Sequence, residues 1–324
     1  MKLFLTKNKK KYRIEIIEWG KMQNKSIIGV DLGGTNVRAG KVSNYEIIDL
    51  YSQKISGNGT KEFVINQVIT TIEKVFDSSV DGIGIGVPSV VDVDNGIVYD
   101  VQNIPSWNQV NLREILENRF RVPVYINNDA NCFVVGEKYF GIAQVYENIV
   151  GLVMGTGLGA GYYYDNHLFM GANCGAGEFG MVQYKDSNYE AYCSGQYFNT
   201  FHNLQGDELL ELAENDDKRA LKIFSEFGTH IGNAITTIIY MLDPEIIILG
   251  GSVSKSFKYF KNSIFSTLAN IPYRNTINNL KIEVSSLPQI AVLGAAALYY
   301  ESKGRSVASI KQELRENNIE NKNI

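Results

Sequence analysis

The stretch from Ile149 to Tyr164 reads IVGLVMGTGLGAGYYY, in which an apolar run enters a glycine turn and leaves it as a tyrosine-rich run. Residues 27–40, IIGVDLGGTNVRAG, follow the same order of apolar run, Gly/Thr turn and second run. Short apolar runs on both sides of a glycine turn are typical of β-hairpins. Two such units in one chain of 324 residues predict two similar lobes that face each other.

The rest of the chain alternates predicted strands with predicted helices. A hairpin is expected between strands 37–42 and 46–55, with its turn at Ser43, Asn44 and Tyr45. Apolar spacing predicts helices over 62–76, 112–120, 130–140 and 290–300, and a mostly helical region over 207–242. Further strands are expected over 27–31, 82–87, 124–126, 149–154 and 245–249. This order indicates an α/β fold.

Charge is distributed unevenly along the chain. The first 25 residues carry eight Lys or Arg against two Glu, a balance of +6, whereas the whole chain has a net charge of −4, so the remainder is at −10. An acidic body argues against an extended nucleic-acid interface, which needs a cationic face. We interpret residues 1–25 as a flexible basic leader and residues 304–324 as a polar tail.

Cysteine usage and hydropathy indicate where the protein acts. Three cysteines, at 132, 174 and 193, cannot pair evenly, and the sequence has no run of 18 or more apolar residues. Disulfides are rare in a reducing cytosol, and a membrane span needs such an apolar run. We therefore predict a cytoplasmic protein that makes no use of a membrane.

The glycine turns have the composition of an anion-binding site. In Asp31-Leu32-Gly33-Gly34-Thr35 the glycines let backbone N–H groups approach a phosphate, and the Thr hydroxyl adds a donor. Asp31, at the strand end, would hold Mg²⁺ or its waters. An equivalent glycine turn at Thr156 would bind a polyphosphate from the second lobe. The other interpretation is that both are tight hairpin turns needing positive φ; two turns at matching places favour phosphate binding.

A dinucleotide site is a rival interpretation of the second turn. Residues 155–160 satisfy the pattern Gly-x-Gly-x-x-Gly/Ala. That pattern is meaningful only when a helix follows, because the helix N-terminus carries the pyrophosphate. Here a tyrosine-rich strand is predicted instead, so the dinucleotide interpretation is disfavoured.

Three acidic residues are candidates for contact with a substrate. Asp129 follows the predicted strand 124–126 and precedes a helix, a position at which α/β sheets bind ligands, so its carboxylate would accept a proton from a substrate hydroxyl. An N-cap role is the other interpretation, and both can hold. Glu178 is expected on a glycine-rich loop with no helix to support, where a polar side chain would touch a ligand. Glu190 by itself reads as an ordinary solvated residue.

Taken in order, the motifs resemble those of the ROK family of sugar kinases and sugar-responsive repressors, over about residues 26–303. Besides the two glycine turns, they comprise Gly84-Ile85-Gly86-Val87-Pro88, Asn103-Ile104-Pro105-Ser106-Trp107, Asn128-Asp129-Ala130-Asn131, Ala176-Gly177-Glu178-Phe179-Gly180, Glu190-Ala191-Tyr192-Cys193-Ser194-Gly195 and Leu249-Gly250-Gly251. The resemblance implies a two-lobed actin/hexokinase-like (ribonuclease H-like) ATPase fold with a central cleft. We expect an N-terminal lobe over 26–127, completed by a C-terminal helix over 290–303, and a C-terminal lobe over 128–289.

The resemblance also implies roles for individual residues. Asp129 would be the base that activates the sugar 6-hydroxyl. Other sugar hydroxyls would be bound by Asn103, Asn128, Gly157, Glu178 and Glu190. The ATP phosphates would be surrounded by Gly33, Gly34, Thr35, Thr156 and Gly157, with Asp31 near Mg²⁺ and with Gly250 and Gly251 against adenosine.

The expected activity is an ATP-dependent hexose kinase that uses ATP and Mg²⁺, acts on glucose and forms a homodimer or a higher homo-oligomer. Three alternatives stay open: a kinase for mannose, N-acetylglucosamine or N-acetylmannosamine; a sugar-binding regulator without its DNA-binding domain; and a noncatalytic sugar-binding module. No nucleic acid is expected as a partner.

One segment departs from the family pattern. Members commonly have His where Met181 stands, followed by a loop with a cysteine-rich zinc site. Here residues 182–189 lead directly to Glu190, so that loop is missing. The remaining candidate ligands are Cys174, Cys193, His167, His202 and His230, and their spacings are not those of a structural zinc site. We therefore expect no zinc site.

Overall fold

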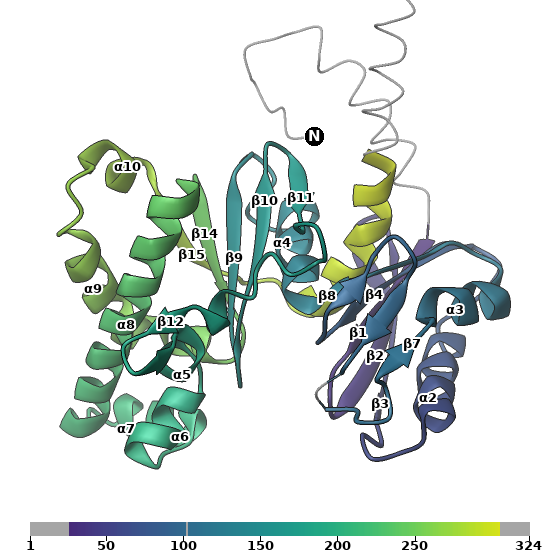
Figure 1. The fold of residues 1–324 in the computed structure, drawn as a ribbon, viewed down its shortest axis with the longest axis horizontal. Coiled ribbons are helices and arrows are strands. Elements are labelled where there is room, and N and C mark those ends of the chain that lie inside the picture. The colour runs from purple at the N-terminus through teal and green to yellow at the C-terminus, as the bar shows by residue number, and fades with distance from the viewer. Residues whose placement is uncertain (1–25, 102, 305–324) are drawn as a thin grey trace, which may run out of the picture.

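The computed structural model describes residues 26–304 apart from residue 102, and Figure 1 shows them as two lobes side by side. Each lobe is built on a five-stranded sheet. The basic leader predicted over 1–25 lies outside the described residues, as does all of the predicted polar tail after residue 304.

The first sheet has the strand order β3-β2-β1-β4-β8. Its strands are β1 (Ser26–Leu32), β2 (Asn36–Ser43), β3 (Glu46–Lys54), β4 (Val80–Val87) and β8 (Val124–Asn128). The first three form an antiparallel meander, whereas β1, β4 and β8 are parallel. Helix α2 (Lys61–Glu73) leads from β3 to β4, helix α3 (Leu112–Phe120) leads into β8, and both pack against this sheet. A small sheet of β5 (Val91–Asp92), β6 (Ile97–Tyr99) and β7 (Gln109–Val110) lies beside it.

The second sheet repeats this arrangement with the order β11-β10-β9-β14-β15. Its strands are β9 (Ile149–Met154), β10 (Leu158–Tyr164), β11 (His167–Phe169), β14 (Ile246–Gly250) and β15 (Lys281–Val284). Helix α4 (Asp129–Tyr139) packs against β9 and β10, and α8 (Lys218–Leu242) pairs with α9 (Phe257–Leu268) on the outer side.

Short elements complete the second lobe. They are η1 (Phe179–Met181), β12 (Gln183–Tyr184), β13 (Ser187–Asn188), α5 (Tyr189–Cys193), α6 (Gln196–His202), α7 (Gly206–Glu214), η2 (Val253–Ser256) and α10 (Arg274–Asn279). None of the helices described between residues 26 and 304 is long and apolar enough to cross a membrane.

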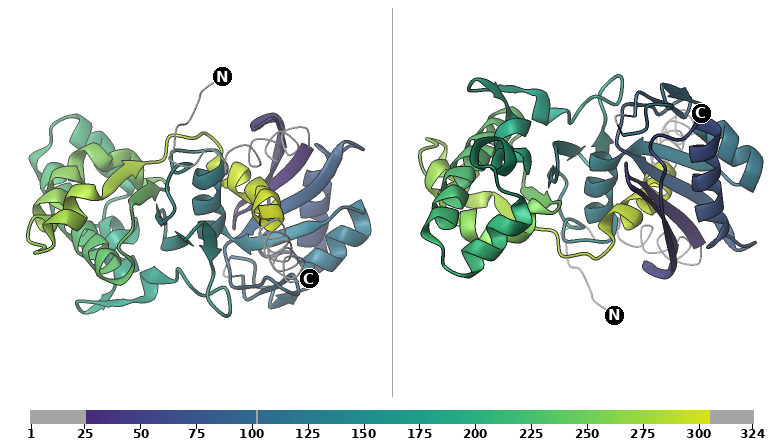
Figure 2. Two further views of the ribbon diagram at one scale, coloured as in Figure 1. Left: turned by 90° about the horizontal axis from the view of Figure 1, so that it is seen from above. Right: turned by 90° about the horizontal axis from the view of Figure 1, so that it is seen from below.

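Residues 290–304 form a helix that packs on the first sheet, and Figure 2 shows it between that sheet and the second lobe. Glycines permit the close packing: a Cβ added to Gly84 on β4 would lie 1.8 Å from the carbonyl oxygen of Ala295. The same helix bonds to the second lobe, because the buried Glu301 carboxylate accepts hydrogen bonds from Tyr163 Oη at 3.0 Å and from Leu168 N at 3.1 Å. This helix therefore joins the two lobes.

The hairpins predicted at the two glycine turns are confirmed as β1 with β2 and β9 with β10. The hairpin of β2 with β3 is also confirmed, except that Ser43 belongs to β2 and the turn is Asn44 and Tyr45. Asn44 and Tyr45 have φ values of 50° and 66° in the β2–β3 turn, and Asp165 and Asn166 have 50° and 60° in the β10–β11 turn, as two-residue turns of type I′ require. The apolar run before the second glycine turn is strand β9, and the tyrosine-rich run after it is strand β10. A helix therefore does not follow this turn, and the dinucleotide interpretation is wrong.

Several element ends differ from prediction. Helix α2 ends at Glu73, not at 76, so Val75 and Phe76 lie beyond it although Val75 is still buried in the core. Strand β8 continues two residues past the predicted end, as far as Asn128, because its backbone pairs with β4 up to Val87. Apolar periodicity alone does not mark either end.

Candidate active site

A cavity of about 520 Å³ lies between the two lobes. One wall comes from the segment after β4, which includes Ser89, and from Asn128 at the end of β8. The other wall comes from the β9–β10 turn and the first two residues of β10, together residues 155–159, and from the segment that carries Glu178 and Glu190. Residues far apart in sequence therefore face a common space.

Parallel pairing explains why Asp31 and Asp129 lie at the same edge of the first sheet. In the register of the sheet, Asp31 on β1 lies beside Gly86 on β4, and Gly86 lies beside Asn127 on β8. The carboxyl ends of parallel strands lie at one edge of a sheet, where ligands bind in open α/β folds. This edge carries both Asp31 and Asp129; Asp129 lines the cavity, whereas Asp31 does not.

Asp129 is the first residue of α4, and its N-cap is Asn128. The Asn128 side-chain oxygen accepts a hydrogen bond from Ala130 N at 2.8 Å. The interpretation of Asp129 as the N-cap is therefore wrong, because β8 extends to residue 128 and places the preceding asparagine at the cap. Asp129 Oδ1 also accepts from Ala130 N at 2.8 Å, and the residue lines the cavity, whose walls surround the carboxylate although water still reaches it.

The environment of Asp129 favours a proton acceptor that works near neutral pH. Burial within the cavity walls raises the pKa of Asp129 to about 6, the Ala130 N–H opposes this shift, and the negative charges of Asp31 and Glu178 add to it. Burial also raises the pKa of Asp31, and the Arg38 guanidinium, 3.7 Å away, opposes that shift. A carboxylate with its pKa close to the working pH suits general-base catalysis.

The two glutamates lie on the opposite wall. Glu178 is followed at once by the single 3₁₀ turn η1, so the expected loop does contain one short helical turn. Glu190 lies in the first turn of α5, where its Oε2 accepts from Leu158 N at 3.0 Å and its Oε1 accepts from Gln196 Nε2 at 3.0 Å. The interpretation of Glu190 as an ordinary solvated residue is wrong, because the protein holds both of its carboxylate oxygens at the cavity.

The glycine turns do not rely on left-handed backbone. Among their glycines at 33, 34, 155, 157 and 159, none has a φ in that region. Two of these positions need glycine because a side chain would not fit. A Cβ on Gly34 would lie 2.3 Å from Asn103 Cβ, and one on Gly157 would lie 2.5 Å from Glu190 Oε2. The interpretation as tight turns needing positive φ is therefore wrong for these positions.

The structure brings together about half of the predicted site residues. The cavity is lined by Asn103, Asn128, Asp129, Thr156, Gly157, Glu178 and Glu190. The other predicted positions, which do not line it, are Asp31, Gly33, Gly34, Thr35, Gly250 and Gly251. Of these, Gly34 abuts Asn103, and Gly251, with φ +83°, abuts the carbonyl of Met154 at the start of the second glycine turn.

Four lining residues with polar side chains were not anticipated from the sequence. They are Ser89, Tyr99, Asp100 and Gln196. Ser89 directly follows the motif that ends in Pro88, just past the carboxyl end of β4. Ligands bind at the carboxyl ends of strands in open α/β sheets, so this position could have been predicted from the sequence. Gln196 opens α6, and nothing in its local sequence points to a ligand.

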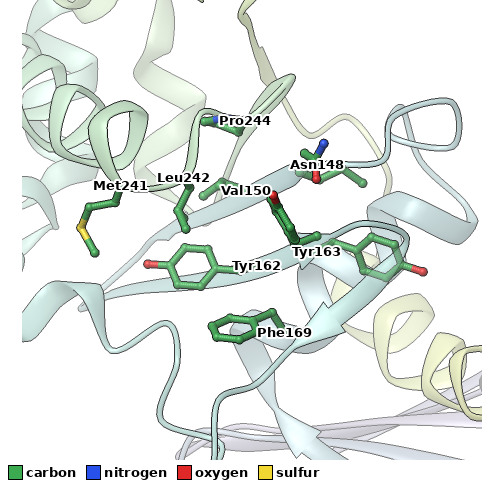
Figure 3. Close-up of a pocket in the computed structure, with 10 residues that line it drawn as sticks. Asn148, Val150, Tyr162, Tyr163, Phe169, Met241, Leu242 and Pro244 are labelled. Atoms are coloured by element: carbon green, nitrogen blue, oxygen red, sulfur yellow. The ribbon is translucent and has the colours of Figure 1, made fainter.

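A second recess of about 230 Å³ lies between β10, β11 and the end of α8 (Figure 3). Its lining includes Tyr162, Phe169, Met241 and Leu242 and no charged residue. The Asp129 cavity, by contrast, is lined by carboxylates that can act as acid or base, so it is the candidate active site. Within residues 26–304, no three His, Cys, Asp or Glu side chains gather to hold a metal ion.

Comparison with known proteins agrees with these features. The ROK family model matches residues 27–302. The chain belongs to the ROK family. It is 28% identical to a glucokinase of Thermotoga maritima over 87% of this chain and all of that protein, and 27% identical to the xylose repressor of Bacillus subtilis over 84% of this chain and 76% of that protein.

The fold also matches solved structures of the family. A ROK family glucokinase of Streptomyces griseus, in complex with glucose and AMPPNP, is 25% identical and superimposes with a TM-score of 0.72 over 84% of this chain and 98% of that one. The predicted two-lobed actin/hexokinase-like fold is confirmed. The family includes both sugar kinases and repressors, so membership alone does not decide between these activities.

Proposed function

We propose that this protein is an ATP-dependent hexose kinase that transfers the γ-phosphoryl group of ATP to the 6-hydroxyl of a hexose, with glucose preferred. The observation that carries the proposal is Asp129: a carboxylate with its pKa raised to about 6 in a cavity that also contains the second glycine turn. A sugar-binding regulator needs no such base.

In this proposal some residues of the cavity bind the sugar, and Asp129 accepts a proton from it. Asn103, Asn128, Glu178 and Glu190 bind sugar hydroxyls and turn the 6-hydroxyl toward Asp129. The Asp129 carboxylate then accepts the hydroxyl proton as the oxygen attacks phosphorus, a contribution of about 10²–10⁴-fold. Positioning of this kind supplies much of the remaining acceleration.

The nucleotide would lie along the glycine turns. Thr156 is exposed at the second turn and would offer its hydroxyl to a phosphate, with Gly157 admitting a close approach. Gly33, Gly34 and Thr35 would approach from the first lobe, and Gly250 and Gly251 would contact adenosine.

The oxygen donors fit Mg²⁺, which prefers one or two carboxylates together with phosphate oxygens. Asp31 lies beside Asp129, close enough for its charge to raise the Asp129 pKa, and would hold the ion through water. When bound, Mg²⁺ neutralises the developing charge on the phosphates. We also propose that the lobes, 26–127 with 290–303 and 128–289, close over the sugar to exclude water.

The test is ADP release with Mg-ATP and a panel of glucose, mannose, N-acetylglucosamine and N-acetylmannosamine. We expect the highest kcat/KM with glucose, and Asp129→Asn should lower turnover by at least about 10²-fold. Asp216→Asn is the matched control, because Asp216 is exposed, has φ 59° and tolerates asparagine there. ADP release at background level with every sugar would reject the kinase proposal.

A regulator remains the second candidate because the xylose repressors are relatives over most of this chain. Calorimetry separates the two: a regulator or noncatalytic module binds hexose without turnover, and a gel shift reports any DNA binding. The homodimer or higher homo-oligomer that we expect is checked by light scattering, and the cytoplasmic location by cell fractionation.

A further inference from the structure

Only eleven residues separate the two glutamates of the cavity, Glu178 and Glu190. They form η1 and a hairpin, β12 with β13, which pairs with itself and with neither large sheet. An isolated two-stranded hairpin is at best marginally stable in water. Other contacts must therefore hold the segment that carries both glutamates.

A stack of three aromatic rings supplies such contacts. Tyr189 lies between Phe179, with ring centroids 4.9 Å apart and planes at 12°, and Tyr184, with centroids 4.6 Å apart and planes at 16°. Phe179 and Tyr189 are both at least nine-tenths buried. Phe179 directly follows Glu178, and Tyr189 directly precedes Glu190, so the stack links the backbones of the two glutamates.

The tyrosine hydroxyl groups of the stack form hydrogen bonds with the long helix α8. Tyr189 Oη and Thr237 Oγ1 are 2.7 Å apart. Tyr184 Oη accepts from Asn233 Nδ2 at 3.1 Å and lies 3.1 Å from His230 Nδ1. The three partners are spaced by three and four residues, which places them on one face of α8.

The protonation of His230 agrees with this arrangement. Burial, and secondarily the Lys185 charge, lower the pKa of His230 to about 4. The imidazole is therefore neutral near pH 7, and its Nδ1 shares a hydrogen bond with the Tyr184 hydroxyl, whose oxygen also accepts from Asn233 Nδ2. The Tyr184 hydroxyl thus has two hydrogen-bond partners on α8, His230 and Asn233.

We infer that Tyr184 and Tyr189 are positioning residues, which hold Glu178 and Glu190 at a fixed separation across the sugar site by stacking with Phe179 and by bonding to α8. The inference rests on the proposed function for what the glutamates bind. It concerns sugar before nucleotide, because the glycine turn belongs to the backbone of β9 and β10 and meets this segment through the hydrogen bond from Leu158 N to Glu190 Oε2.

Three substitutions test the inference. Tyr189→Leu removes the central ring, Tyr189→Phe keeps the ring and removes only the hydroxyl, and Tyr184→Phe removes the hydroxyl that meets α8. Tyr164→Leu is the matched control, because the Tyr164 side chain is 58% exposed on the second recess. The measurements are kcat, KM for glucose, KM for ATP and the thermal midpoint of unfolding.

We expect Tyr189→Leu to raise the glucose KM by about tenfold, the loss that follows when one charged hydrogen bond is misplaced, with the ATP KM changed by less than about twofold. Tyr189→Phe should restore the glucose KM to within about threefold of the unmodified protein. A role in stability alone would lower the active fraction and so kcat, with both KM values unchanged. That result, or equal rises in both KM values, overturns the inference.

Hydrogen exchange gives a readout that needs no catalysis. In the Tyr189→Leu protein the backbone amides of residues 178–190 should exchange faster, with α8 unchanged. If that variant does not fold, Tyr184→Phe is measured in the same way. Unchanged exchange in a folded variant overturns the inference even if the protein is a kinase. Faster exchange in a protein that phosphorylates no sugar rejects the proposed function alone.

Discussion

The ionisation of Asp129 should set the acid limb of the activity profile. As a general base it must be ionised, and its pKa is raised to about 6. A group with this pKa is about nine-tenths ionised at pH 7 and about one-tenth ionised at pH 5. We therefore expect kcat/KM for glucose to fall about tenfold from pH 7 to pH 5.

A second perturbation tests the cause of the raised pKa. Glu178 contributes a negative charge that disfavours ionisation of Asp129. Removing that charge in Glu178→Gln lowers the Asp129 pKa, so the acid limb moves to lower pH. The variant should lose kcat/KM at pH 7 through a lost sugar contact, yet retain a larger fraction of that activity at pH 5 than the unmodified protein does.

The assay should separate Asp129 from the titration of ATP itself. ADP is quantified by chromatography at saturating Mg-ATP from pH 4.5 to 8.5, for the unmodified protein and for Asp129→Asn. The residual activity of Asp129→Asn contains every pH effect except that of residue 129, so the ratio of the two profiles isolates the carboxylate. A ratio that is flat between pH 5 and pH 7, or a limb that moves to higher pH in Glu178→Gln, would refute the assignment.

Two further predictions concern glycines. In Gly157→Ala the new Cβ would lie 2.5 Å from Glu190 Oε2, so the glutamate must move. We expect steady-state kinetics to show a glucose KM about tenfold higher. The control is Gly175→Ala, whose Cβ would meet nothing within 4 Å and should leave the glucose KM unchanged. In Gly84→Ala the Cβ would lie 1.8 Å from the backbone oxygen of Ala295, so urea unfolding should show a loss of at least about 2 kcal/mol, and an unchanged midpoint would contradict the close packing.

Local signals predicted the elements whose causes are local. Strand β9 has the predicted ends, and so does α3, because apolar spacing and flanking turn residues determine both. The turn predicted at Ser43, Asn44 and Tyr45 is found at Asn44 and Tyr45, and asparagine tolerates the left-handed backbone that it needs there. By contrast, both Asn128 and Asp129 are good caps, and only the pairing of β8 with β4 shows which one caps α4.

The amino-acid sequence by itself determined the two glycine hairpins, the α/β order and the family, because these depend on residue types and spacings along the chain. Only the tertiary structure decided which candidates share a cavity and which do not. Asp129, Gly157 and Glu190 are tens of residues apart, and the pKa of Asp129 depends on charges brought to it by β1 and by the segment after Gly177. Distances across a cleft follow from packing of whole sheets, and no local pattern encodes them.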